Sequence, residues 1–319
     1  MMYHVPISVI ISYHNESDTL ETTLNLLIRQ TLLPQEVILV NSSSTDKSYQ
    51  MIQNWIEHQG SKTSIVFRNL QKGTAMPSSS MNVGIRHAEH TLLAFMDCGL
   101  LFEPDWLEKQ VHYMVTHDAE VVSGVCYFEG ITLIDRSAIA QTYGYKRRRP
   151  CVPSTIVKKE VIEQIGFFSE NIRAGYDVDW LNRLKEAGIK RYINESVEVK
   201  YIGINYASSV KGLFFKTVRY SAPGVHVRGY YFPFLYLLSF IIFLTALFSS
   251  LQFGTVLFLG YCIARGYIIP IRKSKGMQLF IEYPLLVGMV PFTGYLIDIA
   301  KIIGYGKGLL GISSPTDNI

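Results

Sequence analysis

The sequence predicts an α/β domain with a mostly parallel sheet, followed by a C-terminal α-helical membrane region. In the first hundred residues, short β-rich runs alternate with amphipathic helical runs, and the connections between them are short. This alternation is typical of a parallel sheet that helices cover on both faces. The character of the chain changes near Tyr230, because Arg265 is the only charged residue between Tyr230 and Ile271. A helical crossing of a bilayer needs roughly 20 apolar residues, so this run is long enough for two crossings.

The first four strands are expected where β-rich runs end in polar loops. The helix after the first strand carries Leu20, Leu24 and Leu27 on one face, and the next helix opens after the N-cap cluster 44–46. Ligands of such sheets bind outside the carboxyl ends of the strands. The expected strands are 7–13, 36–40, 64–67 and 91–96, with helices at 17–30 and 78–89, and the loops that follow the strands are 13–16, 41–44, 68–74 and 97–99.

Beyond residue 100 the pattern predicts more helices, one strand and one irregular segment. Pro104 marks the start of a helix, because a proline in the first turn costs no hydrogen bond. We therefore expect an α/β domain at 1–205, an amphipathic interfacial connector at 206–229 and a membrane region at 230–311. The expected helices are 105–115, 158–165, 178–187 and the basic amphipathic helix 208–221, the strand is 121–128, and segment 131–150 is expected to be irregular.

The membrane region is expected to hold two or three transmembrane helices, at about 231–250, 252–270 and 279–303. Residues 249–252 suit a tight turn between the first two. Arg272, Lys273 and Lys275 follow the second, and the positive-inside rule places them in the cytoplasm. The third run contains two prolines, Glu282 and Asp298, so it is either a kinked crossing or a helix that lies partly in the interface.

Composition narrows the classes of partner and the compartment. The formal net charge of the 319-residue chain is only +4, and no Lys/Arg-rich stretch is interleaved with stacking aromatics, so nucleic acid is not an expected partner. The four cysteines have no paired spacing, which indicates reduced thiols rather than disulfides or zinc. The N-terminus shows no signal-peptide pattern. We therefore expect a multi-pass protein of the cell membrane with its α/β domain in the cytoplasm.

Five segments of the chain carry short motifs with Gly, Asn and Asp. They are 6–16, 36–46, 73–85, 93–99 and 175–180. Each segment alone is weak evidence, because Gly, Asn and Asp occur in turns everywhere. Taken in this order, the five resemble motifs of family 2 glycosyltransferases with the GT-A fold, of the membrane-anchored bacterial and archaeal type: the opening strand and loop, "VVDDGSTD", "GxxxARNxGI", the aspartate motif and "GEDxDW".

The resemblance implies a nucleotide-diphosphate sugar donor. One departure from the family concerns the second loop, where Asn41 replaces its first aspartate. An amide can still pair with a base edge, but it cannot accept from two donors as a carboxylate does. The residues that the resemblance assigns to the nucleotide sugar are Tyr13, Asn15, Glu16, Asn41, Ser43, Asn82, Asp97 and Arg219.

A second departure concerns a metal ion. Asp97 matches one carboxylate of the family's Asp-x-Asp motif, but Gly99 stands at the other position. Mg²⁺ or Mn²⁺ needs several oxygen ligands, so an ion bound at Asp97 would also use donor phosphates, water and another side chain such as Glu103. The alternative for Asp97 is a solvated residue at the end of a strand.

The resemblance assigns the catalytic base to Asp177. The glutamate that usually precedes it is Tyr176 here. Asp177 and Asp179 also suit the first turn of a helix, where carboxylates are favoured by the helix dipole. Asp179 is expected to be structural.

Several basic residues have two interpretations. Arg219-Tyr220 resembles a reduced "QxxRW" region, in which an arginine would contact the donor pyrophosphate. Arg219 could equally face anionic lipid headgroups together with Lys211 and Lys216. The run 146–149 would meet a lipid pyrophosphate or form a solvated surface, and His226 would be a late metal ligand or incidental.

The function expected is inverting transfer of one sugar to a lipid-linked or membrane-held acceptor in cell-surface glycan synthesis, with Asp177 as the base. One alternative is a polyprenyl-phosphate sugar transferase, whose ionised acceptor needs less help from a base. Another is a non-catalytic scaffold of a glycan-assembly complex, since Asn41, Gly99 and Tyr176 all replace acidic residues.

Overall fold

The computed structural model describes residues 5–71, 76–128, 130–170, 172, 174–201, 209–227 and 231–312. The chain forms two compact units. Unit 1 comprises Met1–Tyr127 and Arg148–Ile202, and unit 2 comprises Phe128–Arg147 and Gly203–Ile319. The sequence predicted one continuous domain at 1–205, whereas residues 128–147 pack within unit 2.

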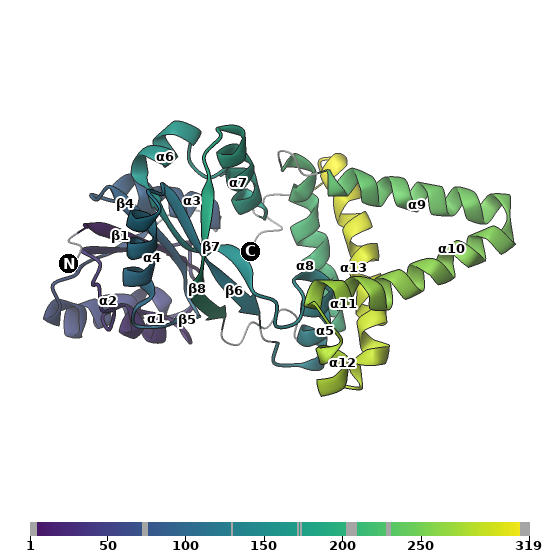
Figure 1. Cartoon of the computed structure of the whole chain (residues 1–319), viewed down its shortest axis with the longest axis horizontal. Helices are drawn as coiled ribbons and strands as arrows, with labels where there is room; N and C mark the ends of the chain where they lie inside the picture. The colour runs from purple at the N-terminus through teal and green to yellow at the C-terminus, as the bar shows by residue number, and fades with distance from the viewer. Residues whose placement is uncertain are drawn as a thin grey trace. The chain divides into compact units, whose positions relative to one another are not determined.

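Unit 1 is built on a mixed eight-stranded sheet (Figure 1). Its strand order is β3-β2-β1-β4-β7-β6-β8-β5. Strands β1 to β4 are parallel, while β7 is antiparallel to both β4 and β6, and β5 is antiparallel to β8. The strands are β1 Ile7–Tyr13, β2 Glu36–Asn41, β3 Val66–Gln71, β4 Leu92–Asp97, β5 Leu100–Phe102, β6 Val121–Phe128, β7 Arg149–Lys158 and β8 Arg191–Tyr201.

The register of the parallel strands brings the predicted loops to one edge of the sheet. Tyr13 at the end of β1 lies opposite Asn41 at the end of β2, and Ser12 lies opposite Asp97 at the end of β4. Because parallel strands share a direction, their carboxyl ends and the loops that follow them meet there. This edge carries the candidate site.

Helices cover the sheet of unit 1. A buried cluster that includes Ile85, Val161 and Trp180 packs α3, α6 and α7 on one face, and Figure 1 shows α1 and α2 on the other side. A Cβ at Gly84 would lie 2.4 Å from Ile10 Cγ2, so glycine allows α3 to approach β1 closely. The helices are α1 Leu20–Leu27, α2 Ser48–His58, the 3₁₀ turn η1 Gly60–Lys62, α3 Pro77–His87, α4 Trp106–Thr116, α6 Lys159–Ile165 and α7 Tyr176–Glu186.

The segment 131–150 is not irregular, so this prediction is wrong. Helix α5 spans Leu133–Thr142, and β7 begins at Arg149. Thr132 and Asp135 form a capping box at the start of α5. Small and polar residues of α5, such as Ser137 and Gln141, are buried as well as its apolar ones, so the helix shows little hydrophobic periodicity. Strand β8 was also missed, because charged residues interrupt its pattern.

Unit 2 is helical. The runs Leu251–Ser274 and Leu286–Leu309 are long and apolar enough to cross a membrane by length and composition, and the apolar helix Phe232–Phe248 is shorter. Ser250 breaks the helix between α9 and α10, where the turn was expected. The elements of unit 2 after α5 are α8 Val210–Ser221, η2 Ala222–His226, α9 Phe232–Ser249, α10 Leu251–Ile263, η3 Ala264–Ile268, α11 Ile269–Ser274, α12 Gln278–Glu282 and α13 Leu286–Leu309.

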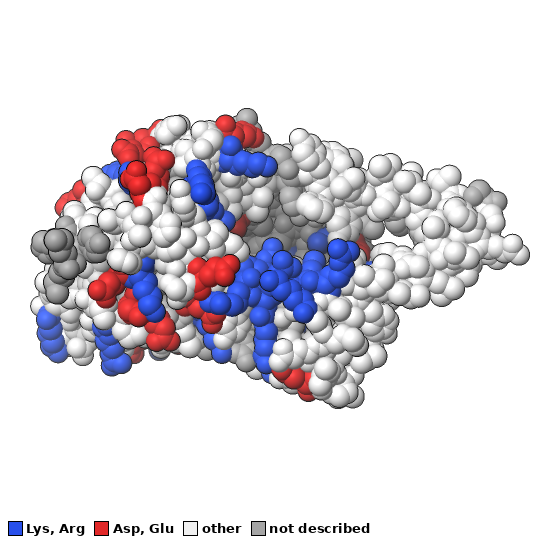
Figure 2. Space-filling model, in the orientation of Figure 1, with Lys and Arg blue, Asp and Glu red and all other residues white. Residues whose placement is uncertain are grey.

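Helix α13 and the α9–α10 hairpin differ in burial. Eleven residues of α13 are buried, and Cβ atoms at Gly304 and Gly308 would lie within 2.5 Å of backbone oxygens of α8 and η2. The third apolar run, expected at 279–303, is therefore divided between α12 and α13, and α13 continues through Pro291 and packs inside unit 2. Helices α9 and α10 instead extend away from α13 (Figure 1), expose most of their large apolar side chains and show no charged residue on the surface of the hairpin in Figure 2.

Candidate active site

The loops after β1 and β2 are joined by side-chain hydrogen bonds. Asn15 has a left-handed backbone (φ 57°), which asparagine tolerates. Its Oδ1 accepts from the backbone N–H of Thr45 at 2.8 Å, and its own N–H donates to Ser44 Oγ at 3.1 Å. The predicted residue Asn15 therefore holds the second loop in place with its side-chain oxygen.

The end of β2 is held by the same kind of contact. Asn41 is buried, and its Oδ1 accepts from the N–H of Ser44 at 2.8 Å. Ser43 follows with a left-handed backbone (φ 60°). Tyr13, at the end of β1, is buried and donates its hydroxyl to Asn69 Oδ1 at 2.8 Å. The structure thus gathers Tyr13, Asn41 and Ser43 at one edge.

Asp97 lies at the end of β4, and one of its carboxylate oxygens accepts a hydrogen bond. Tyr201, at the end of β8, donates its hydroxyl to Asp97 Oδ2 at 2.7 Å. Burial raises the pKa of Asp97 to about 6, and the charges of Glu16 and Asp177 add to this effect, while the Tyr201 hydrogen bond opposes it. The sequence did not single out Tyr201, which lies 104 residues from Asp97 along the chain.

Two further carboxylates therefore affect Asp97, because the charges of Glu16 and Asp177 both raise its pKa. Glu16 comes from the loop after β1, Asp97 from β4 and Asp177 from the start of α7. Burial also raises the pKa of Glu16. The Thr19 hydroxyl, which donates to Glu16 at 2.5 Å, opposes this rise. Like charges in a partly desolvated site favour a proton, a cation or a donor group on one of them.

Asp177 sits in the first turn of α7, partly exposed. Burial raises the pKa of its carboxyl, whereas the backbone N–H groups of Val178 and of Asp177 itself and the charge of Arg191 lower it. Arg191 begins β8, and its Nε donates to Ser123 Oγ at 2.7 Å. Its Nη2 is buried without a hydrogen-bond partner in the part of the chain that the structure describes. Sequence reasoning missed Arg191, which only the path of β8 brings near Asp177.

Asn82 and Asp179 support the segment that leads to α7. The Asn82 amide donates to Phe168 O at 2.8 Å and to Glu170 Oε1 at 2.9 Å, and its oxygen accepts from the Phe168 N–H at 3.0 Å. Asn82 was expected to bind the nucleotide sugar, but its amide is engaged in this segment. Asp179 is buried, accepts from Ser169 Oγ at 2.6 Å and pairs with Arg183 at 3.0 Å, in the structural role expected for it.

The basic residues singled out in the sequence have local partners or lie in unit 2. Lys146 pairs with Glu282 at 3.0 Å within unit 2, and Arg148 pairs with Glu198 at 2.6 Å within unit 1. Arg219 lies on α8 and His226 ends η2, both in unit 2. The assignment of Arg219 to the donor therefore stays a prediction. Gly73, in the third resembling segment, lies outside the described residues.

The residues at this edge fit a divalent ion only with help from the donor. The described residues contain no group of three or more His, Cys, Asp or Glu side chains that could hold a metal ion. Asp97 has one oxygen bonded to Tyr201, and Glu103 is exposed after β5. A hard ion at Asp97 would draw its remaining ligands from phosphate oxygens and water.

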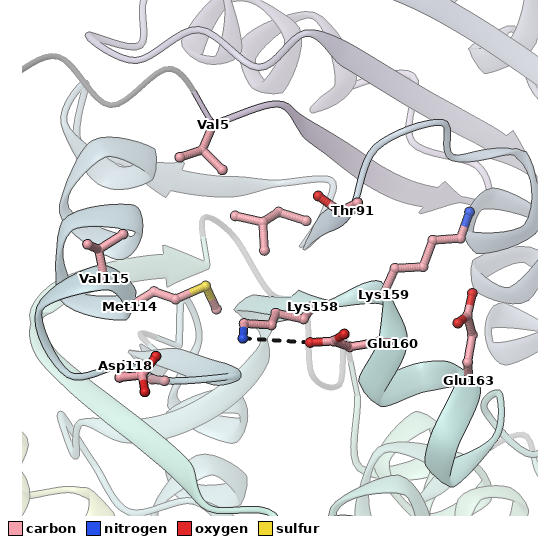
Figure 3. Close-up of a pocket in the computed structure, with 11 residues that line it drawn as sticks. Val5, Thr91, Met114, Val115, Asp118, Lys158, Lys159, Glu160 and Glu163 are labelled. Carbon is pink, nitrogen blue, oxygen red and sulfur yellow. Dashed lines mark ion pairs between the residues drawn. The ribbon is translucent and has the colours of Figure 1, made fainter.

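A cavity of about 580 Å³ lies at the opposite edge of the sheet of unit 1 (Figure 3). Val5 precedes β1, Thr91 precedes β4, and Lys158 ends β7, where it pairs with Glu160 at 3.6 Å. The carboxylates Glu16, Asp97 and Asp177 do not line this cavity. These three candidate residues therefore lie outside this cavity.

Comparison with known proteins identifies the family of the N-terminal part of the chain. The family model described as glycosyl transferase family 2 matches residues 8–166, which include β1 to β4 and the loops after them. The chain belongs to glycosyl transferase family 2. Its mixed sheet and its likeness to a solved mannosyltransferase structure show the GT-A fold.

Two curated relatives illustrate the range of similarity. The glycosyltransferase AglE of Haloferax volcanii is 25% identical over 195 residues, which cover 57% of this chain and 62% of AglE. The validoxylamine A glucosyltransferase of Streptomyces hygroscopicus is 34% identical over 131 residues, 39% of this chain and 27% of that protein. This family 2 chain thus matches less than two thirds of either relative.

A solved structure matches nearly the whole chain. The mannosyltransferase PcManGT of Pyrobaculum calidifontis, solved in complex with GDP-Man and Mn²⁺, has a TM-score of 0.58 and 18% sequence identity. The match covers 97% of this chain and 88% of PcManGT. At this identity the likeness shows the fold.

Proposed function

We propose that this family 2 protein is an inverting glycosyltransferase that moves one sugar from a nucleotide-diphosphate donor to a lipid-linked or membrane-held acceptor in cell-surface glycan synthesis. The observation that carries the proposal is that the charges of Glu16 and Asp177 both raise the pKa of Asp97 at the end of β4, while the charge of Arg191 lowers the pKa of Asp177 at the start of α7. GDP-Man in the similarly folded PcManGT supports a nucleotide-sugar donor.

The reaction is a direct displacement at the anomeric carbon. The acceptor hydroxyl oxygen attacks that carbon and passes its proton to Asp177, while the bond to the donor diphosphate breaks and the nucleoside diphosphate leaves. The environment of Asp177 raises its pKa. This makes it a stronger base at neutral pH than a solvated aspartate, and Arg191 keeps enough of it ionised to accept the proton.

The loops after β1 and β2 would hold the nucleotide through Tyr13, Asn15, Asn41 and Ser43. Asp97 would hold Mg²⁺ or Mn²⁺ together with donor phosphates. Such an ion would neutralise charge that develops on the leaving diphosphate. The Tyr201 hydroxyl fixes the direction of the Asp97 carboxylate.

The apolar helices would anchor the enzyme to the membrane, with the active site on the cytoplasmic side. The exposed apolar surface of α9 and α10 supports this proposal. Confining the enzyme and a lipid acceptor to one surface raises their effective concentration.

The test is Asp177→Asn, which keeps the shape of the side chain and removes the base. We expect transfer to fall by roughly 10²–10⁴-fold, with an unchanged dissociation constant for the donor by calorimetry. Asp118→Asn is the matched control, because Asp118 lies beside the cavity at the opposite edge of the sheet.

Three results would change the assignment. Full turnover in Asp177→Asn refutes the base and favours an acceptor that is already ionised, a polyprenyl phosphate. Failure of the unaltered protein to bind any of a panel of UDP-, GDP- and TDP-sugars, with and without Mn²⁺, favours a non-catalytic scaffold. Binding that does not respond to Mn²⁺ contradicts the metal assignment.

A further inference from the structure

The two charged residues that face each other in the apolar helices of unit 2 form a buried ion pair. Arg265 lies in η3 and Asp298 in α13, and both are more than nine-tenths buried. The guanidinium Nε donates to Asp298 Oδ2 at 2.6 Å and Nη2 donates to Oδ1 at 2.9 Å. This two-point contact is the geometry in which arginine and a carboxylate bind most specifically.

Neutral groups complete the partners of this pair. Tyr261 on α10 donates its hydroxyl to Asp298 Oδ2 at 3.0 Å, and Tyr236 on α9 donates to Oδ1 at 3.3 Å. The remaining nitrogen of Arg265 donates to Gln141 Oε1 on α5. Side chains of α9, α10 and η3 therefore meet at the Asp298 carboxylate of α13, and the charge of Arg265 is matched.

Lys301 adds a positive charge that this carboxylate does not match. It lies three residues after Asp298 on α13, half-buried, with its Nζ 3.4 Å from the Tyr236 hydroxyl and 5.0 Å from the centre of that ring. Among the described residues, no ion pair joins Lys301 to a carboxylate. The charge of Asp298 is therefore compensated by Arg265. A half-buried cation such as Lys301 without its own counter-ion is costly.

The position of the cluster along the hairpin indicates its depth in a bilayer. The chain has no charged residue between Tyr236 and Arg265, and Ser250 breaks the helix between the two arms. Tyr236 lies 13 residues before Ser249, and Arg265 lies 14 residues after Leu251. At 1.5 Å per residue both lie about 20 Å from the turn. Since the hydrocarbon core is about 30 Å thick, a hairpin whose turn lies at the far headgroups would place the cluster about 10 Å below the headgroups on its own side.

We propose that Lys301, held beside the Tyr236 hydroxyl and close to Arg265, binds the phosphate of a membrane lipid at the base of the α9–α10 hairpin. The ligand class is a lipid phosphate, and the apolar arms beyond the cluster suit its hydrocarbon chain. The inference rests on the membrane anchoring under the proposed function. It adds a binding site for the charged head of the acceptor or of a bilayer phospholipid.

The site is tested by binding to the full chain in uncharged detergent micelles, measured by native mass spectrometry. The probes are a polyprenyl monophosphate, a phosphatidylglycerol and the uncharged polyprenol. We expect both phosphates to bind more tightly than the polyprenol. Lys301→Gln is expected to weaken phosphate binding about tenfold, since a charged hydrogen bond is lost, and Tyr236→Phe is expected to weaken it less.

Lys307→Gln is the matched control, because Lys307 is exposed on the same helix, and it should bind as the unaltered chain does. A preference for the polyprenyl phosphate identifies the acceptor as the ligand, and equal binding of the two phosphates identifies a general lipid site. Equal binding by Lys301→Gln and the unaltered chain overturns the proposal, as does polyprenol binding as tight as that of either phosphate.

Failure of this site and failure of the proposed function are distinguishable. The binding experiment contains no donor, so Asp177→Asn should bind lipid phosphate normally while it fails in transfer. Lys301→Gln leaves the Arg265–Asp298 pair intact, so its unfolding midpoint should match that of the unaltered chain. A loss of phosphate binding at an unchanged midpoint then reports the site and not the fold.

Discussion

Asp97 in unit 1 is half-buried and Asp298 in unit 2 is buried. Both accept hydrogen bonds from tyrosine hydroxyls, but they differ in how far positive charge compensates them. Asp97 accepts one tyrosine hydroxyl at 2.7 Å and lies near two other carboxylates, and its pKa is raised to about 6. Asp298 accepts two tyrosine hydroxyls and two nitrogens of Arg265. The negative charge of Asp97 is thus only partly compensated, whereas Arg265 fully compensates that of Asp298.

This difference distinguishes a carboxylate suited to binding, Asp97, from one that holds helices together, Asp298. A carboxylate whose negative charge is not compensated lowers the stability of the protein without ligand. A bound ligand, proton or cation can supply the compensating positive charge or hydrogen bond. A matched pair has no such need and holds helices together. Within unit 2, Lys301 departs from the matched pattern, which is why the lipid-phosphate site is proposed there.

The largest effect is expected from breaking the matched pair with Asp298→Ala. This change leaves Arg265 buried without a counter-charge, and the loss of one partner of a buried pair costs about 3–5 kcal/mol. Denaturant unfolding of the purified chain in detergent measures it. Tyr261→Phe removes one hydroxyl from the same carboxylate and should cost about 1 kcal/mol. Equal, small effects of both changes would show that the pair does not stabilise unit 2.

The opposite sign is expected for Asp97→Asn. A pKa of about 6, against 3.8 for a free aspartate, means that the folded state binds the proton more tightly than the unfolded state does. Protonation of Asp97 therefore stabilises the folded state fully below pH 4. This stabilisation, up to about 3 kcal/mol, is lost as the pH rises through 6. The asparagine variant should unfold at a higher temperature at pH 8 in metal-free buffer and show no gain at pH 4.

The same variant checks the functional side of the comparison. It should lose transfer activity while it gains stability at pH 8. A lower unfolding temperature at pH 8 would mean that Asp97 is already matched in the empty protein, and the contrast with Asp298 would fail.

The smallest effect is expected from Arg191→Gln, which removes the positive charge near Asp177. Since that charge lowers the pKa of Asp177, its loss should move the acidic limb of the kcat/KM profile to higher pH. Activity should fall more at pH 6 than at pH 8. Arg191→Lys should keep the limb near its original position. Lys190→Gln, an exposed neighbour whose ammonium lies over the Tyr192 ring at 4.2 Å, is the control, and a limb that stays in place in Arg191→Gln would remove Arg191 from the mechanism.

Local patterns predicted much of unit 1. Strands β1 and β6 begin and end where the sequence placed them, and β2 and β4 differ by one residue. Their boundaries follow from β-rich runs that stop at polar residues, a signal within a few neighbouring positions. The same reasoning failed for α5, because burial of its polar residues hides the helical period.

Contacts between distant residues could not be predicted in this way. Tyr201 reaches Asp97 because β8 pairs with β5, which follows β4 almost directly. Asn82 carries the motif that assigned it to the donor, yet its amide binds Phe168, 86 residues away. A motif states which side chain is present, but the partner depends on the path of the whole chain.

The sequence by itself determined the family, the parallel strands with their polar loops, and the apolar character of the C-terminal helices, because each of these depends on residues that are close together in the sequence. Only the tertiary structure decided that residues 128–147 belong with unit 2, that Arg265 meets Asp298 and that Arg191 lies near Asp177. These depend on charges brought together from separate segments, and the free energy of a charge depends on what surrounds it in space.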